Sequence, residues 1–256
     1  MAKPKGCGFP PLETIKQCIK VNRHGNALCW NKDGVLHVFR SMDAEETLAK
    51  YKELSKTLNP ATTSLLFHAR LATHGSHNVN NCHGFTHACA RDGKTYAFMH
   101  NGIMHNVDVH NDMTDSECFF RELFVPAMEN VSMDYAMKLT RAVGCGRNRY
   151  ALIDNEGELY LHGGENGYFV ETIPGVKGKI YFSNLNWKPI CSYGTGFDPY
   201  RKSQSKPTAG SGSGLPCVGK RDGVGKKVVP TSSTDSLFPA FAEVVKEFAE
   251  FRSAGE

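Results

Sequence analysis

The first 198 residues of this 256-residue chain alternate strand-like and helix-like segments that are joined by hairpin turns. Asp33-Gly34 and Asn155-Glu156-Gly157 each separate two runs rich in apolar and β-branched residues, and such sequences favour tight turns. Hairpins build antiparallel sheets, whereas regular βαβ crossovers would build a parallel sheet. We therefore predict a layered α+β fold for residues 1–198.

The spacing of apolar residues predicts the individual elements of this domain. Helices are expected over 12–21, 43–58 and 132–143, with a further helix starting at Thr114. Strands are expected over 27–30, 35–39, 62–68, 96–99, 149–154, 158–162 and 179–182.

Composition changes abruptly after residue 198. Residues 199–235 are rich in Gly, Ser, Pro and Lys, which indicates a flexible linker because little apolar surface is available to offset the entropy of ordering. Residues 236–252 place apolar side chains at helical spacing and predict an amphipathic helix. Such a helix is expected to dock either on its own domain or on a partner protein.

Charge and cysteine content exclude several classes of protein. Residues 201–230 carry seven basic residues and one acidic residue, so the rest of the chain is slightly acidic although the whole has a net charge of +4. This distribution argues against a nucleic-acid-binding core. No apolar run is long enough to cross a membrane. The nine cysteines form no CxxC pair, which indicates reduced thiols and a cytoplasmic protein.

Three short segments contain candidate binding residues. The first is Phe67–Gly75, in which Arg70 follows a predicted strand and is suited to bidentate recognition of a carboxylate. An arginine at the end of a strand is also commonly part of a structural ion pair. The second is His100-Asn101-Gly102, whose amide and backbone N–H groups are able to donate to a developing oxyanion. Alone, Asn-Gly is a common turn sequence.

The third segment is Thr114-Asp115-Ser116-Glu117 at the start of a predicted helix. Thr-x-x-Glu is a capping box in its own right, and an acidic residue is favourable in a first helical turn. Asp115 is alternatively a pocket residue that accepts hydrogen bonds from an ammonium group. The two roles are compatible.

Together, these segments resemble those of the class II glutamine amidotransferases, over about residues 2–187. The resemblance is closest to short stand-alone members from bacteriophage genomes, which share segments that match Lys3-Pro4-Lys5-Gly6, Met99-His100-Asn101-Gly102 and Tyr181-Phe182-Ser183-Asn184. It implies a four-layer αββα N-terminal-nucleophile sandwich and hydrolysis of glutamine to glutamate and ammonia, in the cytoplasm of the phage host if the chain is phage-encoded.

The resemblance also implies a role for each motif residue. Arg70 would bind the α-carboxylate of glutamine, with Thr73 and His74 supporting that wall of the pocket. Asn101 and Gly102 would form the oxyanion hole, and Asp115 would bind the α-ammonium group.

The family's nucleophile is a cysteine at the start of the processed chain, but residue 2 here is Ala. Cys7 is one candidate, although Pro10 and Pro11 follow it closely and are unsuited to an interior strand. Alternatively, the chain starts just after the residue that carries the thiol, or catalysis has been lost. The non-catalytic alternative is a glutamine-binding or scaffold protein that attaches to a partner, such as an ammonia-accepting enzyme, through residues 236–252.

A metal-dependent hydrolase is a further alternative, because eight of the eleven histidines lie between residues 68 and 110. No HExxH or paired cysteine spacing organises them. We therefore expect neither a metal nor another cofactor.

Overall fold

The computed structural model describes residues 1–73, 75–143, 148–163, 167–171, 173 and 176–188. These belong to one compact unit, Met1–Pro189. The linker expected over 199–235, the helix expected over 236–252 and the end of the domain expected over 1–198 lie outside the described residues, as does His74.

The larger sheet contains six strands in the order β3-β2-β4-β1-β10-β9, all paired antiparallel. Its hairpin turns at Asp33 and Gly34, whose φ angles of 52° and 76° match a tight two-residue turn. The strands are β1 (Ala2–Lys3), β2 (Asn26–Lys32), β3 (Val35–Ser41), β4 (Leu65–Ala69), β9 (Tyr168–Val170) and β10 (Ile180–Phe182).

The smaller sheet contains four strands in the order β5-β6-β7-β8, also antiparallel. The strands are β5 (Phe85–Ala88), β6 (Thr95–Asn101), β7 (Arg149–Asp154) and β8 (Leu159–His162). The structure therefore confirms an α+β fold with two antiparallel sheets.

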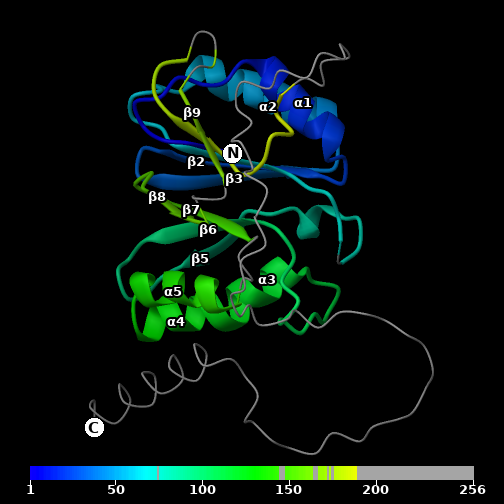
Figure 1. Ribbon diagram of the computed structural model, residues 1–256. Coiled ribbons are helices and arrows are strands. Elements are labelled where there is room, and N and C mark those ends of the chain that lie inside the picture. The colour runs from blue at the N-terminus through cyan, green and yellow to red at the C-terminus, as the bar shows by residue number, and fades with distance from the viewer. Residues whose placement is uncertain (74, 144–147, 164–166, 172, 174–175, 189–256) are drawn as a thin grey trace, which may run out of the picture. The chain divides into compact units, whose positions relative to one another are not determined.

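Helices lie on the outer side of each sheet (Figure 1). Next to the larger sheet are α1 (Leu12–Val21) and α2 (Ala44–Thr57), the latter capped by the Asp43 carboxylate. Next to the smaller sheet are α3 (Asp115–Phe119), α4 (Val125–Asn130) and α5 (Met133–Val143). A short 3₁₀ turn, η1 (Val79–Asn81), precedes β5.

A π-helical turn, η2 (Phe120–Phe124), joins α3 to α4. Pro126 follows one residue after this turn. Proline has no N–H to donate and crowds the carbonyl of the fourth residue before it, here Glu122. Widening the helix to a π turn just before Pro126 relieves this conflict.

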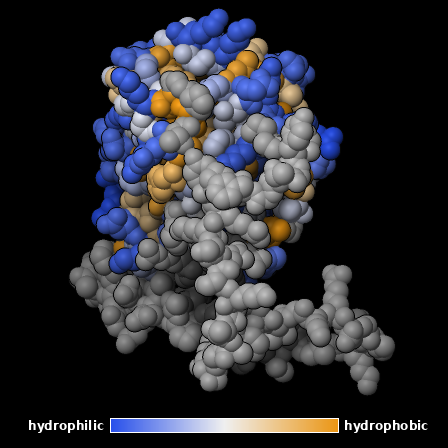
Figure 2. Space-filling view, turned by 45° about the horizontal axis from the view of Figure 1, so that its top comes forward, coloured by the Kyte–Doolittle hydropathy of each residue, from blue (hydrophilic) through white to orange (hydrophobic). Residues whose placement is uncertain are grey.

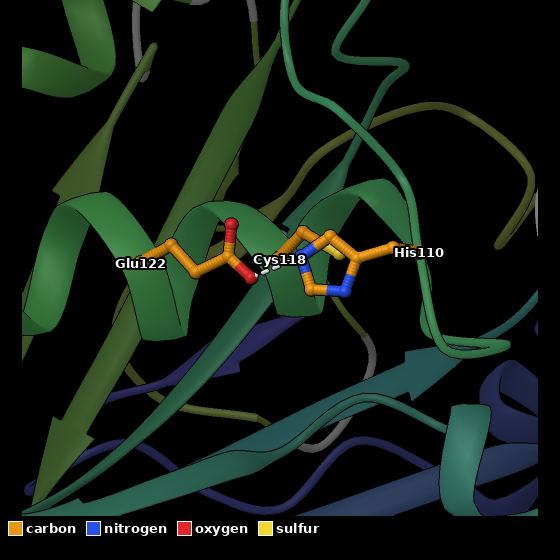
Figure 3. Close-up of side chains that lie close together, drawn as sticks. All are labelled: His110, Cys118 and Glu122. Atoms are coloured by element: carbon orange, nitrogen blue, oxygen red, sulfur yellow. Dashed lines mark ion pairs between the residues drawn. The ribbon is translucent and has the colours of Figure 1, made fainter.

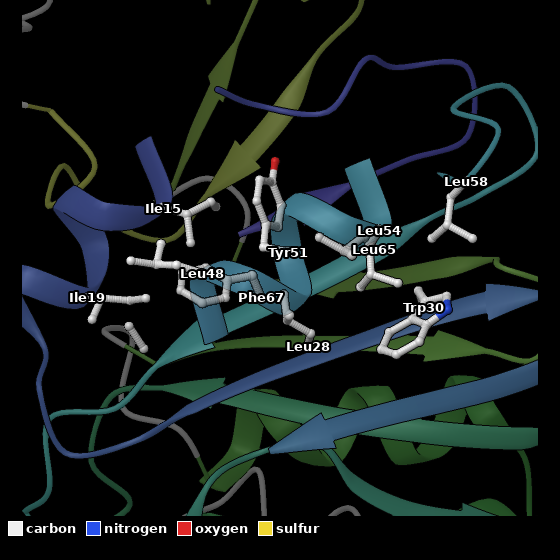
Figure 4. Packing of buried hydrophobic residues seen from close by; sticks show 11 residues of the cluster. Ile15, Ile19, Leu28, Trp30, Leu48, Tyr51, Leu54, Leu58, Leu65 and Phe67 are labelled. Atoms are coloured by element: carbon white, nitrogen blue, oxygen red, sulfur yellow. The ribbon is translucent and has the colours of Figure 1, made fainter. Parts of the chain in front are cut away.

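Alternating side chains of β2 pack in two different cores. Leu28 and Trp30 pack against α1 and α2, together with Tyr51 and Phe67 (Figure 4). Ala27 and Cys29 point to the opposite face and pack against residues of the smaller sheet, including Met99 and Ile153. The period of two along a strand therefore places one strand between two apolar layers.

On the face in Figure 2, hydrophilic side chains surround patches of hydrophobic ones. The most exposed large apolar residues of the described chain include Val35, Leu71 and Phe169. None of the helices in the described ranges is long and apolar enough to cross a membrane.

Most expected elements are confirmed to within a few residues. The strand expected over 62–68 begins later, at Leu65, because Thr62 and Thr63 donate their backbone N–H groups to Asn59 in a turn. Strands β5 and β9 were not expected from the sequence. Both are short and pair only at the edges of their sheets.

Candidate functional site

A cavity of about 230 Å³ lies where β4, β6 and the start of α3 meet. The three sequence motifs converge on it, although Arg70 and Asp115 are 45 residues apart along the chain. Of the expected binding residues, Arg70, Thr73, Asn101, Gly102 and Asp115 all line this cavity. The structure therefore brings together the described members of the predicted pocket.

The cavity lies between the ends of strands from different sheets. β4 ends at Ala69 in the larger sheet, and β6 ends at Asn101 in the smaller one. The backbone N–H of Arg70 donates to the Gly25 carbonyl at 2.8 Å, which fixes the chain as it leaves β4. The charged side chain thus leaves the sheet at a defined position.

Arg70 is only 3% exposed. Its Nη1 donates to the Ser76 carbonyl at 3.0 Å. Ser76 is held in turn by Asp112, whose carboxylate accepts from the Ser76 hydroxyl at 2.6 Å and from its N–H at 3.1 Å. Burial lowers the pKa of Arg70, and Asp115 is among the acidic groups that oppose this shift. The two charges on the cavity wall therefore act on each other.

Asp115 is 4% exposed and is held by backbone groups. One carboxylate oxygen accepts from the Met104 N–H at 2.7 Å and the other from the Ser116 N–H at 2.9 Å. Oδ1 also lies 3.3 Å from the Ser116 hydroxyl, whereas Oδ2 accepts from Met104 and retains a lone pair for a ligand ammonium group.

The segment from Thr114 to Glu117 both caps α3 and lines the cavity. Thr114 Oγ1 accepts from the Glu117 N–H at 3.1 Å. The Glu117 side chain instead pairs with Arg121 at 2.7 Å, so it does not serve as the second half of a capping box. Thr114 thus fixes the first turn that presents Asp115.

Gly102 occupies a position that accepts no side chain. Its φ is +148°, and a Cβ atom built there would lie 1.9 Å from Asn148 Oδ1. Only glycine therefore fits at this point of the cavity wall.

His100 connects the Asn101-Gly102 segment to α3. Its Nδ1 lies 2.8 Å from Ser116 Oγ and its Nε2 lies 2.8 Å from Asn148 Oδ1. Because the amide oxygen accepts, Nε2 carries the proton and Nδ1 accepts from the Ser116 hydroxyl. Burial lowers the pKa of His100, which favours this neutral form.

Two further histidines line the same cavity. The rings of His68 and His83 stack with centroids 3.9 Å apart, and His83 stacks more loosely on His100 at 6.4 Å. Burial lowers the pKa of His68 to about 3, and it lowers the pKa of His83 well below its ordinary value. Neighbouring cationic groups add to both shifts, so both rings are neutral.

The structure does not bring Cys7 to this cavity. Cys7 is 6% exposed and packs in an apolar cluster with Ile173, Ile180 and Phe182. Its Sγ donates to the Lys179 carbonyl at 3.4 Å. None of the six cysteines in the described ranges lines the cavity.

The first residues of β1 lie close to the cavity instead. β1 runs antiparallel to β4, so its N-terminal end points toward the end of β4 that carries Arg70. The Met1 α-amine donates to the Phe67 carbonyl at 2.8 Å. Met1 also lines a smaller cavity of about 30 Å³ together with His68, His100 and Asn101. Burial lowers the pKa of this amine to about 6, so an amine here is largely uncharged at neutral pH.

Sequence reasoning missed part of the lining. His68 and His83 belong to the histidine-rich region, but their stacking gives no signal in the sequence. Asn184 and Asn186 also line the cavity. Asn184 ends the Tyr-Phe-Ser-Asn segment that carries part of the family resemblance. Asn148, which contacts His100, has no recognisable motif.

No protein-family model and no curated protein matches this chain.

Proposed function

We propose that this cavity binds glutamine and that the domain is a class II glutamine amidotransferase-type domain. The observation that carries the proposal is the presence of Arg70 and Asp115, a cation and an anion, on the wall of one small cavity. A free α-amino acid carries the complementary pair of charges. Arg70 would bind the α-carboxylate, and Asp115 would bind the α-ammonium group.

The position of Asn101 and Gly102 supports a ligand with a carboxamide side chain. They line the same cavity and offer an amide N–H₂ and a backbone N–H. Donors of this kind stabilise the negative charge that develops on an amide oxygen during nucleophilic attack. In the class II arrangement, a glutamine bound through its α-carboxylate and α-ammonium groups would place its side-chain amide beside these donors.

The arrangement of layers also supports the family proposal. Helices, the larger sheet, the smaller sheet and further helices follow one another in Figure 1. This order is that expected for a four-layer αββα N-terminal-nucleophile sandwich, in which the active site lies at the start of a central strand. Here β1 is such a strand, with β4 and β10 on its two sides.

Hydrolysis would require a thiol near the N-terminal end of β1. The thiolate would attack the amide carbon, and collapse of the tetrahedral oxyanion would release ammonia and leave a thioester. Water would then cleave the thioester to glutamate and restore the thiol. An adjacent amine with a lowered pKa would accept the thiol proton and return it to the leaving ammonia.

Glutamine binding without turnover is the second candidate function. It is favoured by the absence of cysteine from the cavity lining among the described residues. A short series of N-terminal extensions that begin with cysteine separates the two functions. If the site is catalytically organised, one of these extensions will react with a diazo-ketone analogue of glutamine and release ammonia from glutamine. Binding without any labelling across the series would support the non-catalytic function.

The binding proposal is tested with blocked ligands in a thermal-shift titration. Glutamine should stabilise the protein, whereas N-acetylglutamine and glutamine with an amidated α-carboxylate should not. Asp115→Asn should weaken the response to glutamine. Equal stabilisation by all three ligands would overturn the assignment of Arg70 and Asp115.

A further inference from the structure

A second group of chemically reactive side chains lies outside the cavity, around the helical turns that follow Asp115. His110 comes from the loop before α3, Cys118 from α3 and Glu122 from η2. One imidazole nitrogen, the thiol sulfur and one carboxylate oxygen all lie within 4.8 Å of one another. Figure 3 shows the three side chains pointing toward a common point.

These three atoms are the preferred ligand types of zinc and similar divalent cations. Cys118 and Glu122 are four residues apart, so consecutive helical turns bring them to one side of the helix. His110 Nε2 lies 2.5 Å from Glu122 Oε1, which places the ring on the same side. A thiolate and a carboxylate together balance the charge of a divalent ion.

The other ring nitrogen of His110 already has a partner. Nδ1 lies 2.9 Å from the side-chain amide of Asn111. If the Asn111 side-chain amide rotates by a half-turn, its oxygen instead of its nitrogen faces His110 Nδ1. The amide oxygen then accepts a hydrogen bond from Nδ1–H, and the unprotonated Nε2 is available as a metal ligand. Outer hydrogen bonds of this type orient most metal-binding histidines.

The burial of the group is uneven. Cys118 is 0% exposed, whereas the side chains of His110 and Glu122 are each 44% exposed. An ion pair at such an exposed position contributes little to stability. An ion bound by the buried sulfur of Cys118 and by the partly exposed side chains of His110 and Glu122 would keep one coordination position open to water.

We propose that His110, Cys118 and Glu122 bind one divalent cation of the zinc class, with water as the fourth ligand. The ion joins the loop before α3 to the helical segment that follows it. The same loop contains Asp112, which holds Ser76 beside Arg70. The sequence indicated no metal because the three ligands follow none of the usual spacings.

Equilibrium dialysis of the purified full-length chain against Zn²⁺, followed by elemental analysis, tests this proposal. Roughly one bound zinc per chain is expected. His110→Ala and Glu122→Gln alter exposed side chains and should each weaken zinc binding by at least about tenfold, and Asn111→Ala should weaken it by about 10- to 100-fold. His105→Ala in the same loop is the matched control and should retain zinc.

Cobalt substitution shows whether the sulfur is a ligand. Co²⁺ should produce a thiolate-to-metal charge-transfer band that Cys118→Ser abolishes and that Cys89→Ser, a control at another buried thiol, preserves. Cobalt binding without this band would overturn the three-ligand site. Zinc binding that is absent, or that is unchanged in His110→Ala, would show that His110 and Glu122 form a simple ion pair. These measurements need no glutamine and stand apart from the proposed function of the cavity.

Discussion

The imidazole of His100 accepts a hydrogen bond from the Ser116 hydroxyl at 2.8 Å, and this bond joins the two halves of the candidate pocket. His100 directly precedes Asn101 and Gly102, whereas Ser116 directly follows Asp115. This buried contact and the hydrogen bond from the Met104 N–H to Asp115 therefore hold together the groups proposed to bind the two ends of glutamine.

Replacing Ser116 with alanine should destabilise the protein. The change leaves His100 Nδ1 buried without its partner, and an unsatisfied buried polar atom costs about 1–3 kcal/mol. Denaturant unfolding would measure the loss. Ser55→Ala removes a hydroxyl from a partly exposed position of α2 and is the control. Equal free energies of unfolding for the two variants would contradict a structural role for the His100–Ser116 bond.

Replacing Gly102 with alanine should be more damaging than the same change at Gly93. Both glycines have a positive φ, +72° at Gly93 and +148° at Gly102. A side chain in the left-handed region of Gly93 costs about 1–2 kcal/mol, and the region of Gly102 is less accessible still to other residues. A Cβ at Gly93 would meet no atom within 4 Å, whereas at Gly102 it would collide with Asn148. Denaturant unfolding of the two variants measures the combined cost of backbone strain and collision at Gly102, and an equal loss of stability in both would contradict it.

A double-mutant cycle adds a sharper test of the Gly102 contact. Asn148→Ala removes the side chain that collides with the new Cβ atom, so the combined Gly102→Ala and Asn148→Ala variant should be more stable than additivity predicts. Strict additivity would show that Asn148 is not what excludes a side chain at position 102.

Stability should fall as the pH is lowered from about 6.5 toward 3. His68 is neutral in the folded protein because burial and the nearby Met1 amine, His100 and Arg70 lower its pKa to about 3. The unfolded chain binds its proton near pH 6.5, so between these values the unfolded state holds more protons and gains stability. The loss from this one group amounts to about 1.4 kcal/mol per pH unit.

His68→Phe removes this titration while retaining a flat ring. Urea unfolding between pH 7 and pH 4 should show a smaller pH dependence in this variant than in the wild type. His105→Ala, which alters an exposed histidine, should keep the wild-type dependence. An unchanged slope in His68→Phe would contradict the neutral, buried state of His68.

Local sequence signals predicted the hairpins and most helices because the information for them is local. Asp33-Gly34 favours its turn whatever surrounds it, and Asp43 caps α2 through its own neighbours. Strands β5 and β9 escaped prediction because they are only four and three residues long, which is too short for a clear apolar alternation, and each pairs on one side only, at the edge of its sheet.

The candidate site was predictable only in part. Short motifs at the ends of regular elements can be recognised in the sequence, and such ends contain Arg70, Asn101, Gly102 and Asp115. Cys7 was also a candidate, but Gly8 donates its N–H to the Lys177 carbonyl, and this pairing places Cys7 in an apolar cluster. Contacts such as His100 with Asn148 arise from the packing of β6 against the segment before β7 and leave no local signal.

Isothermal titration of the purified protein with glutamine tests the central claim most directly, with Arg70→Ala measured beside the wild type. We expect saturable binding by the wild type and a loss of at least roughly 30-fold in affinity in Arg70→Ala, since truncating one partner of a buried charge pair costs about 2 kcal/mol or more. Wild-type binding that Arg70→Ala leaves intact, or no binding by a folded wild-type protein, would contradict the account.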